Sequence, residues 1–423
     1  MSISQLFPEE GPTLNLNFAG SRTLDPRITF TRTSTGTYMG SDGLIKVAPA
    51  DAPRFDHRYV NGEIESLGLL VEEQRENLFP YSEDFSNIDW SNFKSSVESV
   101  NIISPDGSTN SFLLKEDTSV DSNHSLSNFL SYESGFKYSF SVFAKPYGSG
   151  NRKLFMLFGA GAFPSQQNAT FDLVNGTVEG ININNGSDAK IEPYPNGWYK
   201  CTLIGTTTTS NASSTSILYL HNGSTVFYTG DGTSGIYIWG AQVEKGAFPT
   251  SYIPTSGSTA TRNPDNASIT GDNFSDWYNQ SEGTLYANFK GGRDSNPAGD
   301  YGTVVAHSNT YVMLSLANNE SKLLGYFQYP GPPTTVSLTI PNSDYIDVGG
   351  NICVSYNSTS TTLVKGLLQS TESINPASSV NPVTFWKLGG STEANNRYLN
   401  GTISQLTYYP TRLTNAQLQT LTK

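Results

Sequence analysis

The stretch Tyr138-Ser139-Phe140-Ser141-Val142-Phe143 decides the fold class, because large apolar residues alternate in it with small polar ones. Residues that alternate in this way point to opposite faces of a β-strand, so one face is buried. The runs Leu154 to Phe158, Trp198 to Ile204 and Ser216 to Leu220 are also strand-like. Turn signals separate these runs, and no helical period is visible. The pattern therefore predicts a sandwich of β-sheets or a jelly roll.

The composition extends this prediction to the whole chain and excludes some partners. Aromatic residues make up 12% of the 423 residues and charged residues only 15%, which is typical of short strands joined by tight turns. The 25 basic and 37 acidic residues leave a net charge of −12. Nucleic acids and anionic membranes require basic surfaces, so neither is an expected partner. No apolar run approaches the ~18 residues of a membrane helix, so no membrane insertion is expected.

Residues 1–76 form the first of three expected segments, and they contain only a few strands. Leu14, Leu16 and Phe18 alternate with polar residues, and Asp42-Gly43 and Asn61-Gly62 are hairpin turn signals. So few strands cannot bury a generous core alone. We therefore expect this segment to pack on a neighbour, on another copy of itself or on a larger assembly.

Two sandwich domains are expected after this segment. Residues 77–255 contain the jelly-roll strands. Residues 256–266 are rich in Ser and Thr, contain Pro264 and indicate a linker, and residues 267–423 repeat the strand pattern. A terminal helix is expected over Asn415 to Thr422, with Thr414 as its cap. The fold class is therefore all-β, with a short N-terminal β segment followed by two β-sandwiches.

Several motifs are more specific than this pattern. Within the first 85 residues they are Leu24-Asp-Pro-Arg-Ile-Thr-Phe-Thr-Arg-Thr-Ser-Thr-Gly-Thr-Tyr38, Ala52-Pro-Arg-Phe-Asp56, Leu67-Gly-Leu-Leu-Val-Glu-Glu-Gln-Arg-Glu-Asn-Leu-Phe79 and Tyr81-Ser-Glu-Asp-Phe85. Through them the chain resembles bacteriophage virion surface proteins of the tail-fibre type. Asn196-Gly-Trp-Tyr199 and Trp239-Gly-Ala-Gln-Val-Glu244 are similar to the carbohydrate-binding-module jelly roll of such proteins. The stretch Asn400 to Pro410 is similar to concanavalin A-like, laminin-G-type sandwiches.

The resemblance implies a non-enzymatic, lectin-like virion protein that binds host surface glycans during attachment. It would be made in the host cytoplasm, exposed on the particle, and joined to other virion proteins through residues 1–76. A homotrimer is expected, because trimers are common among phage fibres. The alternatives are a capsid decoration, cement or head-fibre protein with a structural role, and a polysaccharide depolymerase.

Candidate catalytic and metal-binding residues are few. No pair of acidic residues has an interpretable spacing, and His57, His124, His221 and His307 lie far apart, so no enzyme is expected. Jelly rolls of the carbohydrate-binding type often hold a structural calcium ion near the first and last strands. Glu83 and Glu244 are the candidate ligands here, although Trp239-Gly240 stands where related modules often have an aspartate.

Aromatic residues in turn-rich stretches are the candidates for glycan binding, because a sugar ring stacks on an aromatic face. They are Tyr147, Phe163, Tyr301 and Tyr329. Each could instead only cover a strand edge. Trp198, Trp239 and Trp386 lie inside apolar strands and are expected in the core. Cys201 and Cys353 are expected to be buried small hydrophobic residues, and no cofactor other than calcium is expected.

Overall fold

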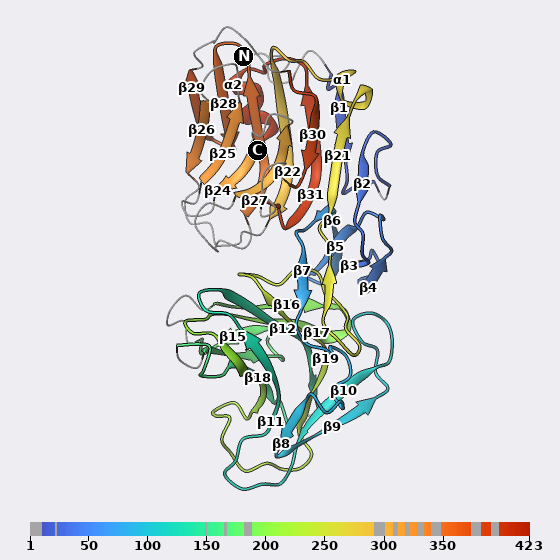
Figure 1. Ribbon diagram of the computed structural model, residues 1–423, viewed down its shortest axis with the longest axis vertical. Coiled ribbons are helices and arrows are strands. Elements are labelled where there is room, and N and C mark those ends of the chain that lie inside the picture. The colour runs from blue at the N-terminus through green and yellow to red at the C-terminus, as the bar shows by residue number, and fades with distance from the viewer. Residues whose placement is uncertain are drawn as a thin grey trace.

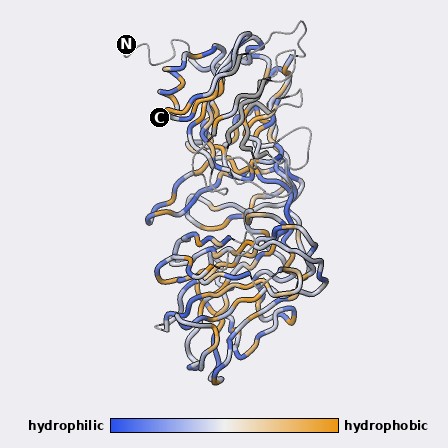
Figure 2. The backbone as a smooth tube through the Cα atoms, turned by 90° about the vertical axis from the view of Figure 1, so that its left-hand side faces the viewer, coloured by the Kyte–Doolittle hydropathy of each residue, from blue (hydrophilic) through white to orange (hydrophobic). Residues whose placement is uncertain are grey.

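The computed structural model describes most of the chain, and the described part is all-β. The described ranges are 11–21, 23–148, 150–164, 167–181, 188–291, 301–307, 312–317, 322–327, 334–339, 348–373, 382–390 and 397–423. The chain forms two lobes that are stacked along its longest axis, with strands in every layer (Figure 1). Figure 2 shows the same two lobes after a 90° turn. The predicted fold class is confirmed.

The jelly-roll lobe consists of two antiparallel sheets. One sheet has the order β16 (Asp188–Tyr194), β17 (Trp198–Thr206), β12 (Lys137–Tyr147), β19 (Gly235–Lys245), β10 (Ser111–Glu116) and β9 (Ser95–Val100). The other has the order β15 (Thr177–Glu179), β14 (Gln167–Asp172), β13 (Lys153–Phe158), β18 (Asn211–His221), β11 (Ser125–Tyr132) and β8 (Ser91–Phe93). Rings such as Phe140, Phe158 and Phe171 fill the space between the sheets and are fully buried. The stretch that predicted the fold is the centre of β12.

The other lobe is also a two-sheet sandwich. One sheet has the order β29 (Leu368–Ser373), β28 (Ser360–Lys365), β27 (Val348–Tyr356), β22 (Gly283–Gly291), β31 (Gly401–Tyr409), β6 (Glu63–Val71) and β5 (Phe55–Val60), and β1 (Leu14–Asn17) also pairs with β31. The facing sheet has the order β2 (Thr29–Thr31), β21 (Asn266–Thr270), β30 (Phe385–Leu388), β23 (Tyr301–His307), β24 (Val312–Ala317), β25 (Lys322–Phe327) and β26 (Thr334–Thr339). Trp386 and Tyr408 lie at the centre of this core.

The N-terminal strands are built into this second sandwich, which corrects the expected separate segment. Leu16 of β1 lies opposite Leu406, and Leu69 of β6 lies opposite Ile403 further along the same strand. A Cβ atom at Gly68 would lie 2.2 Å from the Ile403 carbonyl oxygen, so only glycine permits this approach. The apolar face of residues 14–71 is therefore buried inside its own chain. An external neighbour is not needed to cover it.

The expected linker is a structured neck between the lobes. Strand β7 (Arg75–Asn77) leads into the jelly roll, β20 (Ala260–Arg262) leads out of it, and the two pair antiparallel. Tyr81 and Ser256 form a further bridge beside this pair. The jelly roll is therefore an insertion that enters and leaves the sandwich through paired strands. Residues 256–266 do not behave as a free connection.

Buried charges reinforce the neck. Asp265 is fully buried and accepts from Arg32 Nη1 at 3.0 Å, and it also pairs with Arg54. Glu72 pairs with Arg54 at 2.8 Å and accepts from the backbone N–H of Ser251 at 2.8 Å. Burial alone would raise the pKa of Glu72, but the neighbouring guanidinium groups lower it to about 2. The cluster therefore stays ionised and ties N-terminal residues to both ends of the insertion.

Several local predictions are confirmed. Strand β3 (Gly36–Met39) pairs with β4 (Ile45–Ala48) around Gly43, which has the positive φ of 77° that the hairpin signal requires. The terminal helix α2 (Asn415–Leu421) begins at Thr414, which forms a capping box with Gln417. A short helix, α1 (Asp272–Ser275), was not predicted. The tryptophan and cysteine residues that were expected in the core are all at most 1% exposed: Trp198, Trp239, Trp386, Cys201 and Cys353.

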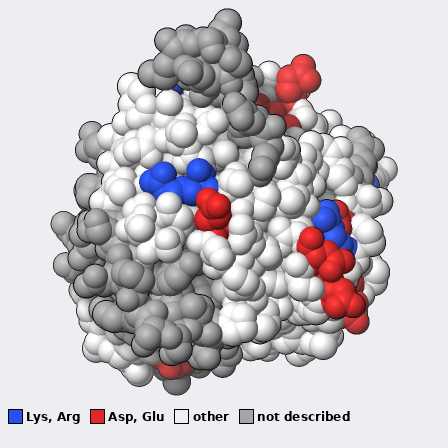
Figure 3. Space-filling model, turned by 90° about the horizontal axis from the view of Figure 1, so that it is seen from above, with Lys and Arg blue, Asp and Glu red and all other residues white. Residues whose placement is uncertain are grey.

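The surface agrees with the low charge of the sequence. Among the described residues at the end of the sandwich lobe, seen from above, most are uncharged, and the charged side chains stand in small groups (Figure 3). Within the described residues, no helix combines the length and the apolar character needed to cross a membrane.

Candidate functional site

Two of the four predicted aromatic residues fall wholly or partly outside the described part of the chain. Tyr147 ends β12, is half-buried, and contacts Tyr237 edge to face with ring centroids 5.1 Å apart. Tyr301 begins β23 in the other lobe, and its side chain lies outside the described part. Tyr329 also lies outside the described residues. Of these positions, Tyr147 and the backbone of Tyr301 are described, and they lie in different lobes.

Phe163 is a core residue, which corrects its prediction as a binding residue. Its side chain is 3% exposed, and its ring stacks on Phe158 with centroids 4.3 Å apart. Tyr132 contacts the same ring edge to face at 5.1 Å. The loop that carries Phe163 turns inward and closes the end of the jelly-roll core. No face of this ring is left for a ligand.

The two predicted calcium ligands are satisfied by protein donors. Glu244 is fully buried and accepts from the backbone N–H of Thr250 at 2.8 Å. Glu83 accepts from the hydroxyl of Tyr252 at 2.9 Å and from the amide of Asn110 at 2.8 Å. Burial raises the pKa of Glu83. Among the described residues, no group of three or more His, Cys, Asp and Glu side chains is placed to hold a metal ion.

Ring side chains gather instead on the outer face of the sheet that contains β13 and β18. Phe155 of β13 lies directly opposite Tyr219 of β18, and their ring centroids are 5.8 Å apart. His221 follows on the same face of β18, with its ring nearly parallel to that of Phe155 at 6.4 Å. All three are half-buried. The intervening residues point into the core and are fully buried: Leu154, Met156, Leu218 and Leu220.

This row of rings continues across the neighbouring strands. Ser125 of β11 lies opposite both Tyr219 and Phe93, so the same row reaches β8. Adjacent strands are about 4.8 Å apart, which places Phe93 roughly 10 Å beyond Tyr219. Phe93 is 51% exposed, and Phe129, on the same face of β11, is 55% exposed. We call Phe93, Phe129, Phe155, Tyr219 and His221 the aromatic face.

A charged group borders the aromatic face on one side. Lys153, which precedes Phe155 on the same face of β13, contacts Asp172 at 2.9 Å and Glu179 at 2.7 Å. Burial acts to raise the pKa of Asp172, but hydrogen bonds, including one from Lys153, lower it to about 2. Burial and the nearby Lys153 lower the pKa of His221, so its imidazole is neutral at neutral pH. One positive and two negative groups therefore border the neutral rings, and the border carries a small negative charge.

The chemistry of this face suits a neutral, ring-shaped ligand with hydroxyl groups. Flat aromatic rings offer apolar contact area to C–H groups, and Tyr219 adds a phenolic hydroxyl. Hydroxyl side chains stand between the rings, among them Ser127 and Thr215, which are both half-buried.

Sequence reasoning missed this face, although a signal was present. The sequence pattern predicts strands over residues 154–158 and 216–220. It does not by itself show which positions of these strands point outward to solvent and which point into the core. Phe155 and Tyr219 are aromatic at outward positions, between neighbours that are apolar and inward. The missing information was the register that places these two residues opposite each other.

Comparisons with known proteins add little to this geometry. No protein-family model matches the sequence, and no curated protein matches it. One similar solved structure is the mouse laminin alpha1 chain, domains LG4-5, with 11% identity and a TM-score of 0.22. The similarity covers 68% of this chain and 86% of that chain. At that TM-score it assigns neither a ligand nor a function.

Proposed function

We propose that this chain is a non-enzymatic surface protein that binds host glycans through the aromatic face of its jelly-roll lobe. The observation that carries the proposal is the row of Phe155, Tyr219 and Phe93 across neighbouring strands. A pyranose presents an apolar C–H face to such rings, while its hydroxyls bond to side-chain hydroxyls between them. A flat sheet of rings suits an extended saccharide better than a single small molecule.

The proposed setting is the surface of a bacteriophage particle, in a tail fibre or a similar appendage. The phage-type motifs at Leu24 to Tyr38 and at Leu67 to Phe79 support it. The alternative role as a capsid decoration protein relied on an N-terminal segment with an uncovered apolar face. That face is buried beside β31 and β21, so an uncovered apolar face no longer supports the decoration role. A homotrimer remains part of the proposal.

A glycan array with the full chain tests the proposal. We expect binding to host-envelope saccharides, and we expect Phe155→Ala and Tyr219→Ala each to weaken it about tenfold, because each removes a stacking ring. Tyr219→Phe keeps the ring and should lose less. Phe227→Ala is the matched control, since Phe227 is an exposed ring (58%) outside the aromatic face. Unchanged binding by both alanine variants would contradict the proposal, as would an array without any bound glycan.

A further inference from the structure

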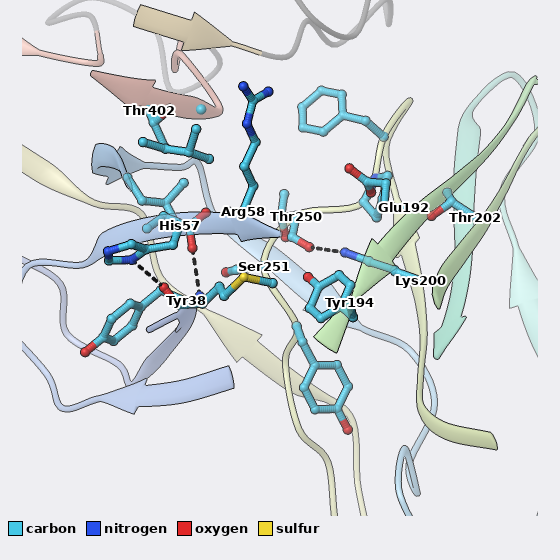
Figure 4. Close-up of a pocket in the computed structure, with 18 of the residues that line it drawn as sticks. Tyr38, His57, Arg58, Glu192, Tyr194, Lys200, Thr202, Thr250, Ser251 and Thr402 are labelled. Atoms are coloured by element: carbon cyan, nitrogen blue, oxygen red, sulfur yellow. Dashed lines mark hydrogen bonds between the residues drawn. The ribbon is translucent and has the colours of Figure 1, made fainter. Parts of the chain in front are cut away.

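The boundary between the lobes contains a cleft of about 440 Å³. Its walls come from four parts of the chain: β3 and β5 of the N-terminal strands, β16 and β17 of the jelly roll, residues 248–252, and the adjoining ends of β22 and β31 (Figure 4). The aromatic face belongs to the opposite sheet of the jelly roll, so the two sites share no residue. The cleft exists only when both lobes are folded and joined.

A buried ammonium group with an incomplete set of partners points into this cleft. Lys200 of β17 is 7% exposed, and its Nζ donates to the carbonyl of Thr250 at 3.2 Å (Figure 4). An ammonium group has three donors, so two remain for a ligand. Lys200 forms no ion pair within the described residues. Glu192 lies opposite it in register, but pairs with Lys190 at 2.9 Å.

A second unsatisfied polar group lies beside this lysine. Thr202 follows on the same face of β17, lines the cleft, and is 1% exposed. Within the described residues, its hydroxyl has no hydrogen-bond partner. A buried unpaired hydroxyl is unfavourable, so a ligand that bonds to it here would be favoured. Two neighbouring side chains therefore offer donors to the same space.

The remaining lining suits a sugar that carries an acidic group. Tyr38, Tyr59 and Tyr194 line the cleft, and Tyr194 is held by an edge-to-face contact with Phe143 at 4.9 Å. The lining contains four basic side chains (Arg58, Lys190, Lys200 and Lys290) and three acidic ones (Asp56, Glu72 and Glu192). Two of the basic groups are themselves paired, Arg58 with Glu65 at 2.7 Å and Lys190 with Glu192 at 2.9 Å. Two of the acids are engaged in ion pairs, with Arg54 and with Lys190.

We propose that the cleft binds an acidic monosaccharide unit, with its carboxylate or phosphate group held by Lys200 Nζ and Thr202 Oγ1. The sugar ring then lies among the tyrosine rings, and its hydroxyls face Asp56, which also accepts from the backbone N–H of Met39 at 2.7 Å. Uronates and sugar phosphates share this chemistry: an oxyanion on a polyhydroxylated ring. The site is separate from the aromatic face and does not depend on it.

Calorimetric titration of the full chain tests this proposal with four probes: glucuronate, glucose 6-phosphate, glucose and inorganic phosphate. We expect at least one of the two acidic sugars to bind at least tenfold more tightly than glucose. Lys200→Met should abolish that preference, and Thr202→Val, which keeps the side-chain shape, should weaken the acidic sugar about threefold to tenfold. Lys137→Met is the matched control, a lysine of the same lobe outside the cleft lining.

Lys200→Met is expected to fold, because it removes a buried charge that has only a neutral partner. Should it unfold, Thr202→Val alone decides the outcome. Phe155→Ala must leave the acidic sugar bound, which separates this site from the aromatic face. Equal affinity for glucose and both acidic sugars, no binding of any probe, or unchanged binding by the Thr202 variant would overturn the proposal. Inorganic phosphate that binds as tightly as glucose 6-phosphate would overturn the assignment to a sugar.

Discussion

The two lobes are both two-sheet sandwiches, but they are assembled from the chain in different ways. The jelly roll uses one uninterrupted stretch, from β8 to β19. The other sandwich combines β1, β2, β5 and β6 with strands that follow the jelly roll, so Leu16 pairs with Leu406 across 390 residues. This difference shows that the N-terminal segment is a part of the second sandwich. It completes the second sandwich and leaves the jelly roll as an inserted lobe.

Separating the lobes is expected to have the largest effect. A fragment of residues 77–255 contains every strand of the jelly-roll sheets and should fold with a cooperative thermal transition. A fragment of residues 260–423 lacks the partners of one whole edge of β31 and should not fold, because Leu14, Leu16, Phe18 and Leu69 are missing from its core. Circular dichroism melting of both fragments measures this. A folded 260–423 fragment would break the comparison.

The buried ion cluster at the neck should be the next most sensitive feature. Asp265→Asn leaves Arg32 and Arg54 buried without this carboxylate, and we expect a loss of about 3–5 kcal/mol in the free energy of unfolding. Asp25→Asn is the control, since its pair with Arg27 is partly exposed and worth less than about 1 kcal/mol. Urea denaturation measures both. Equally small losses in the free energy of unfolding for both variants would mean that the buried ion cluster does not stabilise the neck.

Within the jelly roll, the corrected position of Phe163 is open to a direct check. Phe163→Ala should lower the free energy of unfolding by about 3 kcal/mol, because it removes a ring stacked inside the core. Phe129→Ala removes an exposed ring and should change it by less than about 0.5 kcal/mol. Denaturation of the 77–255 fragment measures this difference. The opposite ranking would restore Phe163 as a surface residue.

The smallest expected effect concerns Asp56 in the wall of the cleft. Burial raises the pKa of Asp56 to about 6, and the nearby negative charge of Glu72 acts in the same direction. As the pH rises from about 4 to about 6, the unfolded chain loses this proton before the folded chain does, so folding becomes less favourable. Asp56→Asn still accepts from the Met39 N–H. It should stabilise the chain by about 1–2 kcal/mol at pH 7 and by almost nothing at pH 4.

Melting temperatures of wild type and Asp56→Asn at both pH values measure this effect. A variant that is equally stabilising at pH 4 and pH 7 would show that Asp56 carries no shifted proton.

Local patterns predicted much of the fold. Alternation located β12, the Asp42-Gly43 signal located a hairpin, and Thr414 located the start of α2. The place of β1 could not be predicted in this way, because its partner is at the other end of the chain and any apolar strand could have covered that face. The neck was also missed, because Ser and Thr are equally common in flexible linkers and in short paired strands.

The candidate site was less predictable than the fold. Loop-like surroundings made Tyr147 and Phe163 candidates for binding. The burial of a loop residue depends on how the loop turns, and the loop of Phe163 turns inward. Phe155 and Tyr219 lie in recognised strands, yet the register that joins them comes from pairing across more than 60 residues. The unsatisfied hydroxyl of Thr202 is a property of three-dimensional packing and leaves no trace in the sequence.

The central claim is that the aromatic face binds its glycan without help from the other lobe. The most direct test compares the dissociation constants of the 77–255 fragment and the full chain for an uncharged glycan found on the array. We expect the fragment and the full chain to bind with equal affinities, because the aromatic face lies entirely within residues 93–221. Phe155→Ala should weaken the binding of both about tenfold. A folded fragment that has lost the glycan, while the full chain still binds it, would contradict the account.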